Sequence, residues 1–277
     1  MQRFLVSETE RSQKALATEK VEQAVQAIHE DGYLVLENII SHDHLDILRE
    51  KMTEDSHTLI NADKWGGAGR LPGHLQQGPP PFAPYVFPDI VANPFITQVT
   101  KGVLGAGMFN SFYSGNTNCP GSNEQPLHSD QQHLWPNLPV AHPAASLVVN
   151  IALRDVTIAD GAIELWPGSH LETRTTGRID ADIAAERREV NPPIRGETKK
   201  GDVLIRDMRV WHRGVPNQSD ELRHMIALVH NISWRERKQI LKFNKGCEAA
   251  FEGVSMDQNV EFVDEEIDYL FQPFIGP

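Results

Sequence analysis

The strand signal that decides the fold is LVVNIAL at residues 147–153, a short run dominated by apolar side chains. A second run of this kind, RHMIALV, covers residues 223–229. Short runs rich in β-branched and other apolar residues are typical of buried strands. Strand and turn signals alternate from Met108 to near Trp234. We therefore expect a β-rich core over residues 107–234.

The sequence before this core has helical patterns. Apolar residues recur at helical spacing between Thr18, which can cap a helix, and Gly32, which can end it. A second helix is expected after Ser41 and a third from Asn93 onward. Helices first and strands after predict a mainly β fold with flanking amino-terminal helices. The expected core is a double-stranded β-helix, the jelly-roll or cupin-like architecture.

We expect one domain over residues 1–277. It consists of a helical part (18–106), the jelly-roll core (107–234) and an acidic carboxyl-terminal extension (235–277). The extension is expected to pack over the core or to form an oligomer contact, as in a homodimer. Residues 58–88 show little periodicity and are rich in Gly and Pro. Long loops in compact domains are commonly functional, so we favour a lid over the site described next, with a surface loop as the alternative.

Within the β-rich region, His128-Ser129-Asp130 is followed much later by His212. Residues i and i+2 of a strand project from the same face, so His128 and Asp130 could reach one metal ion. Two imidazoles and one carboxylate match the facial triad of non-haem Fe(II) oxygenases, which leaves positions for co-substrate, water and dioxygen. We therefore predict that His128, Asp130 and His212 are the metal ligands and the catalytic centre.

Arg223 opens the apolar run RHMIALV after a polar turn. An arginine that enters a core needs an anion to compensate its charge. A dicarboxylate co-substrate would supply that anion and could be gripped by both arms of the guanidinium. The alternative is an ordinary arginine on an exposed strand edge.

Together these features resemble the phytanoyl-CoA dioxygenase family over roughly residues 18–234. The motifs that carry the resemblance are DGYLVLEN (31–38), PLHSDQ (126–131), DGAIELWPGSH (160–170), GDV (201–203) and HRG (212–214). The resemblance implies Fe(2+) as cofactor, 2-oxoglutarate as co-substrate and O2 as oxidant. It also implies that Arg223 binds the far carboxylate of 2-oxoglutarate.

Further residues are candidates for binding the co-substrate or the substrate. By its position in the family pattern, Asn150 is expected to contact 2-oxoglutarate or, alternatively, neighbouring backbone. Gln125 is a weaker candidate for co-substrate binding. The candidates for the substrate cavity are Gln131, His133, Trp135, Arg70 and His74, with packing under the 58–88 segment as the alternative for Trp135.

The expected reaction is oxidation of an unactivated C–H bond of a small molecule, in secondary metabolism. Hydroxylation is the default outcome, and desaturation, cyclisation or endoperoxidation would use the same ligands. Asp130 disfavours halogenation, because related iron halogenases lack this carboxylate. The alternatives are a cupin-like metal enzyme without 2-oxoglutarate, an acyl-CoA hydroxylase and a non-catalytic binding module.

Composition restricts the partners and the location. The formal net charge is −12, which argues against nucleic acid as a partner and mildly against a coenzyme A ester as substrate. The two cysteines, Cys119 and Cys247, are far apart in the sequence, which suits a reducing compartment. The sequence contains no long apolar span, secretory signal or peroxisomal Ser-Lys-Leu end. We therefore expect a cytoplasmic protein without a membrane partner.

Overall fold

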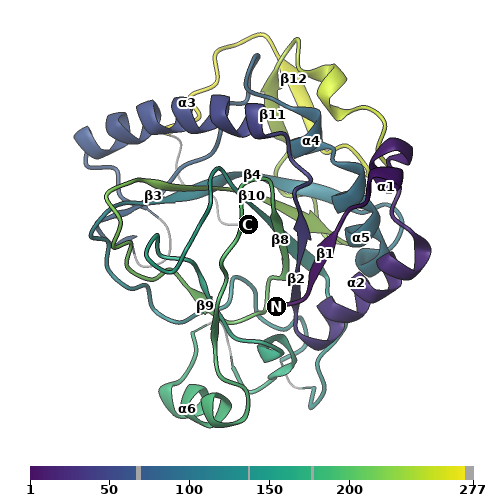
Figure 1. Cartoon of the computed structure of the whole chain (residues 1–277), viewed down its shortest axis with the longest axis vertical. Coiled ribbons are helices and arrows are strands. Elements are labelled where there is room, and N and C mark those ends of the chain that lie inside the picture. The colour runs from purple at the N-terminus through teal and green to yellow at the C-terminus, as the bar shows by residue number, and fades with distance from the viewer. Residues whose placement is uncertain (67–69, 137, 176–177, 272–277) are drawn as a thin grey trace.

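The main sheet of the computed structural model has seven strands in the order β1-β2-β8-β5-β10-β4-β3 (Figure 1). These strands are β1 (Arg3–Leu5), β2 (Tyr33–Glu37), β3 (His74–Gln76), β4 (Phe109–Asn118), β5 (Ser146–Ala152), β8 (Val203–Asp207) and β10 (Arg223–Asn231). Only β1 and β2 pair in parallel; the other neighbours are antiparallel. The structure describes residues 1–66, 70–136, 138–175 and 178–271.

A smaller sheet has the order β7-β6-β9. Its strands are β6 (Glu164–Leu165), β7 (Ile194–Arg195) and β9 (His212–Arg213). Leu165 of β6 packs in one buried cluster with Val35 of β2 and Leu204 of β8, so the two sheets face each other. The predicted mainly β class with a jelly-roll core is therefore confirmed.

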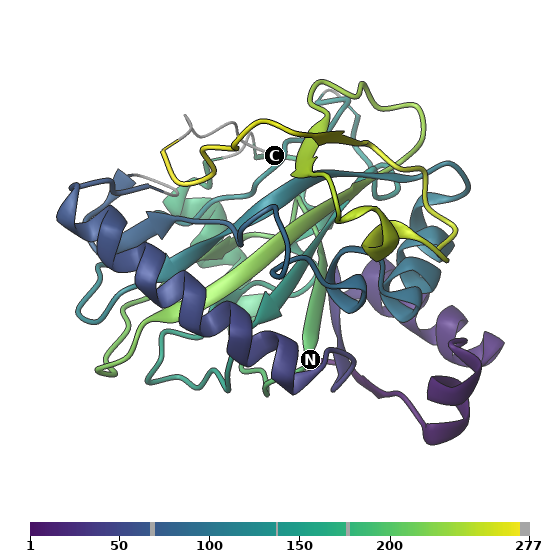
Figure 2. The same cartoon turned by 90° about the horizontal axis from the view of Figure 1, so that it is seen from above.

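Helices cover the outer face of the main sheet, and the longest of them, α3, runs along it (Figure 2). The helices on this side are α1 (Glu8–Gln13), α2 (Thr18–Glu30), α3 (His42–Asn61), α4 (Pro88–Val91) and α5 (Pro94–Leu104), whereas α6 (Ala181–Val190) lies apart and packs against the cluster of Trp166 and Trp211 (Figure 1). Helix α5 begins after Asn93, as predicted, and the Asn93 side chain caps it by accepting hydrogen bonds from two backbone N–H groups. Thr18 is the first residue of α2, whose cap is Ala17.

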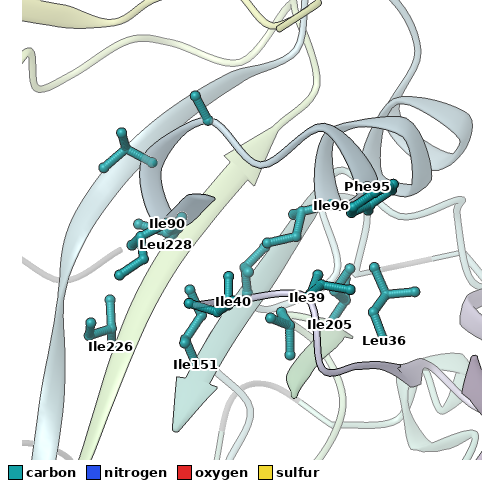
Figure 3. Close-up of a cluster of buried hydrophobic side chains, with 14 of the residues drawn as sticks. Leu36, Ile39, Ile40, Ile90, Phe95, Ile96, Ile151, Ile205, Ile226 and Leu228 are labelled. Atoms are coloured by element: carbon teal, nitrogen blue, oxygen red, sulfur yellow. The ribbon is translucent and has the colours of Figure 1, made fainter. Parts of the chain in front are cut away.

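The outward side chains of the central strands form the core with these helices (Figure 3). Ile226 and Leu228 of β10 lie in the same buried cluster as Ile151 of β5 and Ile205 of β8. Burying one such side chain contributes about 1.5–3 kcal/mol. This cluster therefore stabilises the sheet from its outer side and leaves the inner side for other groups.

The carboxyl-terminal extension packs over the core, which was one of the two predicted arrangements. It forms a parallel pair of short strands, β11 (Leu241–Asn244) and β12 (Val260–Val263). The rings of Phe243 and Phe251 lie 4.7 Å apart, and both belong to the main core cluster. None of the helices in the described part of the chain has the length and apolarity that crossing a bilayer requires.

The structure departs from the sequence prediction in two segments. Residues 58–88 are not one loop, because α3 continues to Asn61 and residues 74–76 form β3; residues 67–69 lie outside the described part. Leu59 extends the helix by packing with Leu75 and Cys119. The core region also contains α6, a helix that was not predicted. This helix has no buried residue and therefore lacks the apolar stripe on which prediction depends.

Candidate metal centre

The centre of the candidate site is an antiparallel pair formed by His128 and His212. The His128 N–H donates to the His212 carbonyl at 3.1 Å, and the His212 N–H donates to the His128 carbonyl at 2.9 Å. Residues that exchange both backbone bonds lie directly opposite each other, with their side chains on one face. The two imidazole centroids are accordingly 4.4 Å apart. Backbone pairing thus joins two histidines that are distant in the sequence.

Asp130 reaches the same place by a turn of the chain. Residues 128–130 form an isolated bridge and a bend, so the regular strand that we expected there is wrong. The backbone N–H groups of Asp130 and Gln131 both donate to the Met208 carbonyl, at 3.0 and 3.1 Å. Asp130 Oδ1 then lies 3.7 Å from His128 Nε2 and 3.5 Å from His212 Nε2. One donor atom from each residue of the triad lies within 4.8 Å of the others.

Backbone carbonyls orient both imidazoles. His128 Nδ1 lies 2.8 Å from the Pro126 carbonyl oxygen, and His212 Nδ1 lies 3.0 Å from that of Val210. Since a carbonyl can only accept, each Nδ1 carries the proton and each Nε2 keeps its lone pair. Ligating histidines are commonly fixed in this way by the nitrogen that does not bind the metal. Both Nε2 atoms face the Asp130 carboxylate.

The protonation states also suit a divalent cation. Partial burial would raise the pKa of Asp130, but Arg206 and the two imidazoles lower it well below its usual range. Burial and the charge of Arg206 lower the pKa of His212 to about 3. A neutral imidazole and an ionised carboxylate are the forms that bind metal. The triad therefore fits the donor set that non-haem Fe(II) prefers.

Arg206 is a site residue that the sequence prediction missed. Its Nη2 donates to Asp130 Oδ2 at 2.6 Å and its Nε donates to Asn150 Oδ1 at 3.3 Å. The guanidinium is buried, and it binds the carboxylate oxygen that does not face the imidazoles. The available signal was an arginine inside the apolar strand VLIRD, residues 203–207, which resembles the setting of Arg223.

Arg223 is buried on the inner face of β10, so the exposed-edge alternative is wrong. Its Nη1 donates to Asn116 Oδ1 at 3.4 Å, and its Nε has no hydrogen-bond partner among the described residues. Burial and the nearby Arg154 lower the pKa of Arg223 to about 10, so the side chain stays charged at neutral pH. A buried cation with so few acceptors has unused capacity to bind an anion.

A small cavity of about 20 Å³ lies beside Arg223 and is also lined by Asn150, Thr198 and Met225. That volume suits a single water molecule rather than a dicarboxylate. A diacid would therefore have to displace flexible lining groups, such as the unbranched side chain of Met225. Asn150 lies between this cavity and Arg206, so its amide contacts a side chain rather than only backbone.

Gln125 is held by the chain that follows His212. The side-chain Oε1 of Gln125 accepts the Gly214 N–H at 2.9 Å, and the backbone N–H of Gln125 donates to the Gly214 carbonyl at 2.8 Å. A Cβ on residue 214 would lie 2.6 Å from Oε1, so a larger residue there would displace the Gln125 amide. In this structure Gln125 therefore binds backbone next to the triad.

The substrate candidates after Asp130 are divided between the site and its surroundings. With its amide oxygen turned toward Arg235, Gln131 accepts from both terminal guanidinium nitrogens. Both ring nitrogens of His133 are engaged, with the Glu172 carbonyl and with Arg209. Trp135 is 51% exposed, so the alternative that it packs under the 58–88 segment is wrong.

The two candidates in the 58–88 segment also differ. Arg70 is exposed and lines a cavity of about 640 Å³ at the edge of β4. His74 is buried on β3, and its Nε2 lies 2.7 Å from the Asn123 carbonyl oxygen. The segment lines this cavity instead of forming a separate flap above the triad, because β3 is part of the main sheet.

The fold and the site together define a jelly-roll protein with a candidate His-Asp-His metal centre. The family model described as phytanoyl-CoA dioxygenase (PhyH) matches residues 28–225, and the chain belongs to this family. The predicted resemblance is thereby confirmed.

Individual relatives are distant. The dioxygenase FrzG of Cladobotryum sp is 31% identical over 113 residues, which are 40% of this chain and 36% of FrzG, so the match spans about a third of that relative. The iron/alpha-ketoglutarate-dependent dioxygenase ausU of Aspergillus calidoustus is 25% identical over 75% of this chain and 70% of its own. The epimerase SnoN, solved in complex with Fe3+, alpha ketoglutarate and nogalamycin RO, superposes with a TM-score of 0.58 at 17% identity, covering 80% of this chain and 89% of SnoN.

Proposed function

We propose that this protein is an Fe(II)- and 2-oxoglutarate-dependent dioxygenase that oxidises a C–H bond of a small molecule. The observation that carries the proposal is the convergence of His128, Asp130 and His212, whose donor atoms lie within 4.8 Å of one another. Membership of the phytanoyl-CoA dioxygenase family supports it. In a cupin-like enzyme without a co-substrate, no anionic ligand would compensate the buried charge of Arg223.

The triad would hold the iron through His128 Nε2, His212 Nε2 and Asp130 Oδ1. Bound iron, with 2-oxoglutarate and O2, would supply the oxidation of an unactivated C–H bond, while 2-oxoglutarate is converted to succinate and carbon dioxide. Carbonyls of Pro126 and Val210 keep the two imidazoles in the ligating tautomer. Hydroxylation is the proposed default outcome, and desaturation, cyclisation or endoperoxidation require the same ligands.

Arg223 would bind the far carboxylate of 2-oxoglutarate. The support is its burial together with its unpartnered Nε, since a carboxylate can accept from two guanidinium nitrogens at once. Asn150 would contribute to the same site, because it lines the cavity beside Arg223. We assign Gln125 a positioning role, because its side chain binds the backbone of Gly214, two residues after His212.

Arg206 would act as a positioning residue. Its bond to Asp130 Oδ2 keeps that oxygen turned away from the imidazoles, so that only Oδ1 faces the metal position. The positive charge also favours the ionised carboxylate. The polar bridge from Asp130 through Arg206 to Asn150 would couple the metal position to the co-substrate cavity.

The relatives point to the same cofactors and to small organic substrates. The name of ausU states iron and alpha-ketoglutarate dependence, and the SnoN complex contains Fe3+, alpha ketoglutarate and nogalamycin RO. We therefore propose a role in secondary metabolism, with neither nucleic acid nor membrane as partner. We also propose a cytoplasmic protein with reduced cysteines; Cys119 and Cys247 are both buried and unpaired in the structure. A homodimer is the oligomeric state to test by light scattering.

The test is succinate release by protein loaded anaerobically with Fe(II) and then exposed to O2 and 2-oxoglutarate. Arg223→Gln should raise the KM for 2-oxoglutarate at least about tenfold, since a charged hydrogen bond contributes about 1.5–3 kcal/mol. Arg223→Lys should restore part of this affinity because it restores the charge. An unchanged KM in the glutamine variant would contradict the assignment of Arg223, and no succinate release with any metal loading would contradict the proposed reaction.

A further inference from the structure

A cavity of about 640 Å³ lies along β4, beyond the short stretch of that strand that pairs with β3. Its volume falls within the roughly 300–1,000 Å³ that small-molecule sites occupy. The walls come from the segment after α3, from β4 and from carboxyl-terminal residues at 239–243 and 267–271. Three separate parts of the chain therefore enclose it.

The charged side chains that line this cavity, among the described residues, are all basic. Lys64, Arg70 and Lys242 line it, and none of its described lining residues is Asp or Glu, although the chain as a whole has a net charge of −12. Lys242 forms an ion pair with Glu265 at 3.6 Å. Lys64 and Arg70 have no such partner in the part of the chain that the structure describes. An anionic ligand would compensate these two cations.

The rest of the lining is rich in aromatic rings, among them Trp65, Phe112 and Tyr269. The wall that contains Tyr269 is firmly attached, because the Tyr269 hydroxyl donates to Asp55 of α3 at 2.8 Å. Its ring also meets Phe82 edge to face at 5.6 Å. Aromatic walls of this kind bind flat or polycyclic apolar bodies.

Two connections join this cavity to the candidate metal centre. Phe112 is partly buried against a cluster that contains Met208, and the Met208 carbonyl accepts the backbone N–H groups of Asp130 and Gln131. With the Gln131 amide oxygen turned toward it, Arg235 also donates to Gln131, and Arg235 lies four residues before the lining segment at 239–243. Through Phe112, the cavity therefore borders the same buried cluster as Met208, whose carbonyl holds the backbone of Asp130.

We propose that this cavity receives the substrate, and that the substrate is a compact acid with an aromatic or polycyclic body. The acidic group lies toward Lys64 and Arg70, the body lies between the aromatic walls, and the end nearest Phe112 faces the metal triad. This inference rests on the proposed function and narrows it from a small molecule to a largely apolar anion. A coenzyme A thioester, in which phosphates carry the charge, is the competing source of that anion.

Calorimetry with matched ligands tests the charge preference without any iron. 6-Fluoro-2-naphthoate should bind the full-length protein about tenfold more tightly than the neutral isostere 6-fluoro-2-naphthamide. The variant with both Lys64→Gln and Arg70→Gln should lose that preference while its affinity for the amide stays within about twofold. Lys238→Gln, at an exposed lysine outside the cavity, is the matched control and should change neither affinity.

The same fluorinated acid tests the position of the cavity. Mn(II) at the triad should broaden its 19F resonance in the bound state, whereas Zn(II) should not, and His212→Ala should remove the difference. Electron paramagnetic resonance reports separately whether Mn(II) is bound. Absence of triad-dependent Mn(II) binding would overturn the proposed function itself, and that result does not depend on the naphthoate measurements.

Three results would overturn the inference while the proposed function stands. The first is equal affinity for the acid and the amide, or a preference that survives in the double variant. The second is bound Mn(II) that leaves the 19F line unchanged. The third is tighter binding of 6-fluoro-2-naphthoyl-CoA than of the free acid by tenfold or more, which would assign the site to a thioester.

Discussion

On β10, a buried arginine and two large apolar side chains face opposite sides of the sheet. Outward, Ile226 and Leu228 pack into the cluster that the helices cover (Figure 3). Inward, the same strand begins with Arg223, whose guanidinium is buried with few acceptors. Apolar contacts on the outer face stabilise the fold, whereas buried charges on the inner face cost free energy unless a ligand compensates them. The difference indicates that residues which stabilise the fold lie on the outer side of the sheet, whereas the candidate functional residues lie on its inner side.

The largest expected effect is on the inner side. His212→Ala should reduce 2-oxoglutarate turnover below about one-thousandth of the original rate, because the metal carries the oxidation and loses a ligand. The circular dichroism spectrum should stay that of the folded protein. Succinate release measures the activity, and His57→Ala, at an exposed histidine on α3, is the control. Comparable activity in both variants would mean that the triad does not hold the metal.

Neighbouring substitutions on β10 test the separation directly. Ile226→Ala should lower the free energy of unfolding by about 2–5 kcal/mol, because it leaves a cavity in the helix-covered core. Met225→Ala, on the inner face and only half-buried, should cost less stability and alter the KM for 2-oxoglutarate instead. Urea unfolding and steady-state kinetics measure the two quantities. Equal stability losses with equal KM values would refute the separation of the faces.

Arg206→Lys probes an inner residue that does not itself belong to the triad. A lysine keeps the charge but cannot bind Asp130 and Asn150 together, so the affinity for Fe(II) or Mn(II) should fall about 10–100-fold. Mn(II) titration followed by electron paramagnetic resonance measures this change. Unchanged metal affinity would show that Arg206 does not position Asp130.

The smallest expected effect is a pH dependence that arises on the outer face. Burial lowers the pKa of His230 to about 4, and burial together with Arg223 lowers that of His224 to about 3. In the unfolded chain both imidazoles titrate near 6.5, so below that pH the unfolded state binds more protons. The contribution of these two histidines to the free energy of unfolding should therefore be fully present above about pH 6.5. It should fall as the pH decreases toward 4, by at most about 1.4 kcal/mol per pH unit for each histidine.

Chemical denaturation between pH 7 and pH 4.5 measures this slope. His230→Asn, which can keep a hydrogen bond to Thr100, should reduce the slope by up to one proton without changing its sign. A slope that is the same with and without His230 would mean that this imidazole is protonated in the folded state.

Much of the candidate site was predictable because its residue types and order are distinctive. His128, Asp130, His212 and Arg223 were named from spacing and from the apolar run that Arg223 opens. The assumed route was wrong for Asp130, which is positioned by a bend that Met208 holds rather than by a strand. Arg206 was missed although it too stands in an apolar strand, because that local setting does not show that its guanidinium binds Asp130.

The errors in the predicted fold have the same cause, namely contacts between residues that are far apart in the sequence. Helix α5 carries a capping Asn, a Pro in its first turn and an apolar face, so its boundaries follow from local chemistry. Helix α6 has no buried side chain, and the two ends of the 58–88 segment are ordered by contacts such as Leu59 with Leu75. Such contacts join residues that are separated in the sequence, and local patterns do not record them.

By itself the sequence determined the jelly-roll class, the family and the three candidate donor side chains, because periodicity, residue type and motif order are properties of the linear chain. Tertiary structure alone decided that His128 and His212 lie directly opposite each other and that Arg206 binds Asp130. It also decided that distant segments of the chain form a cavity lined by basic and aromatic side chains. These are distances between residues far apart along the chain, and only the packing of two sheets against each other fixes them.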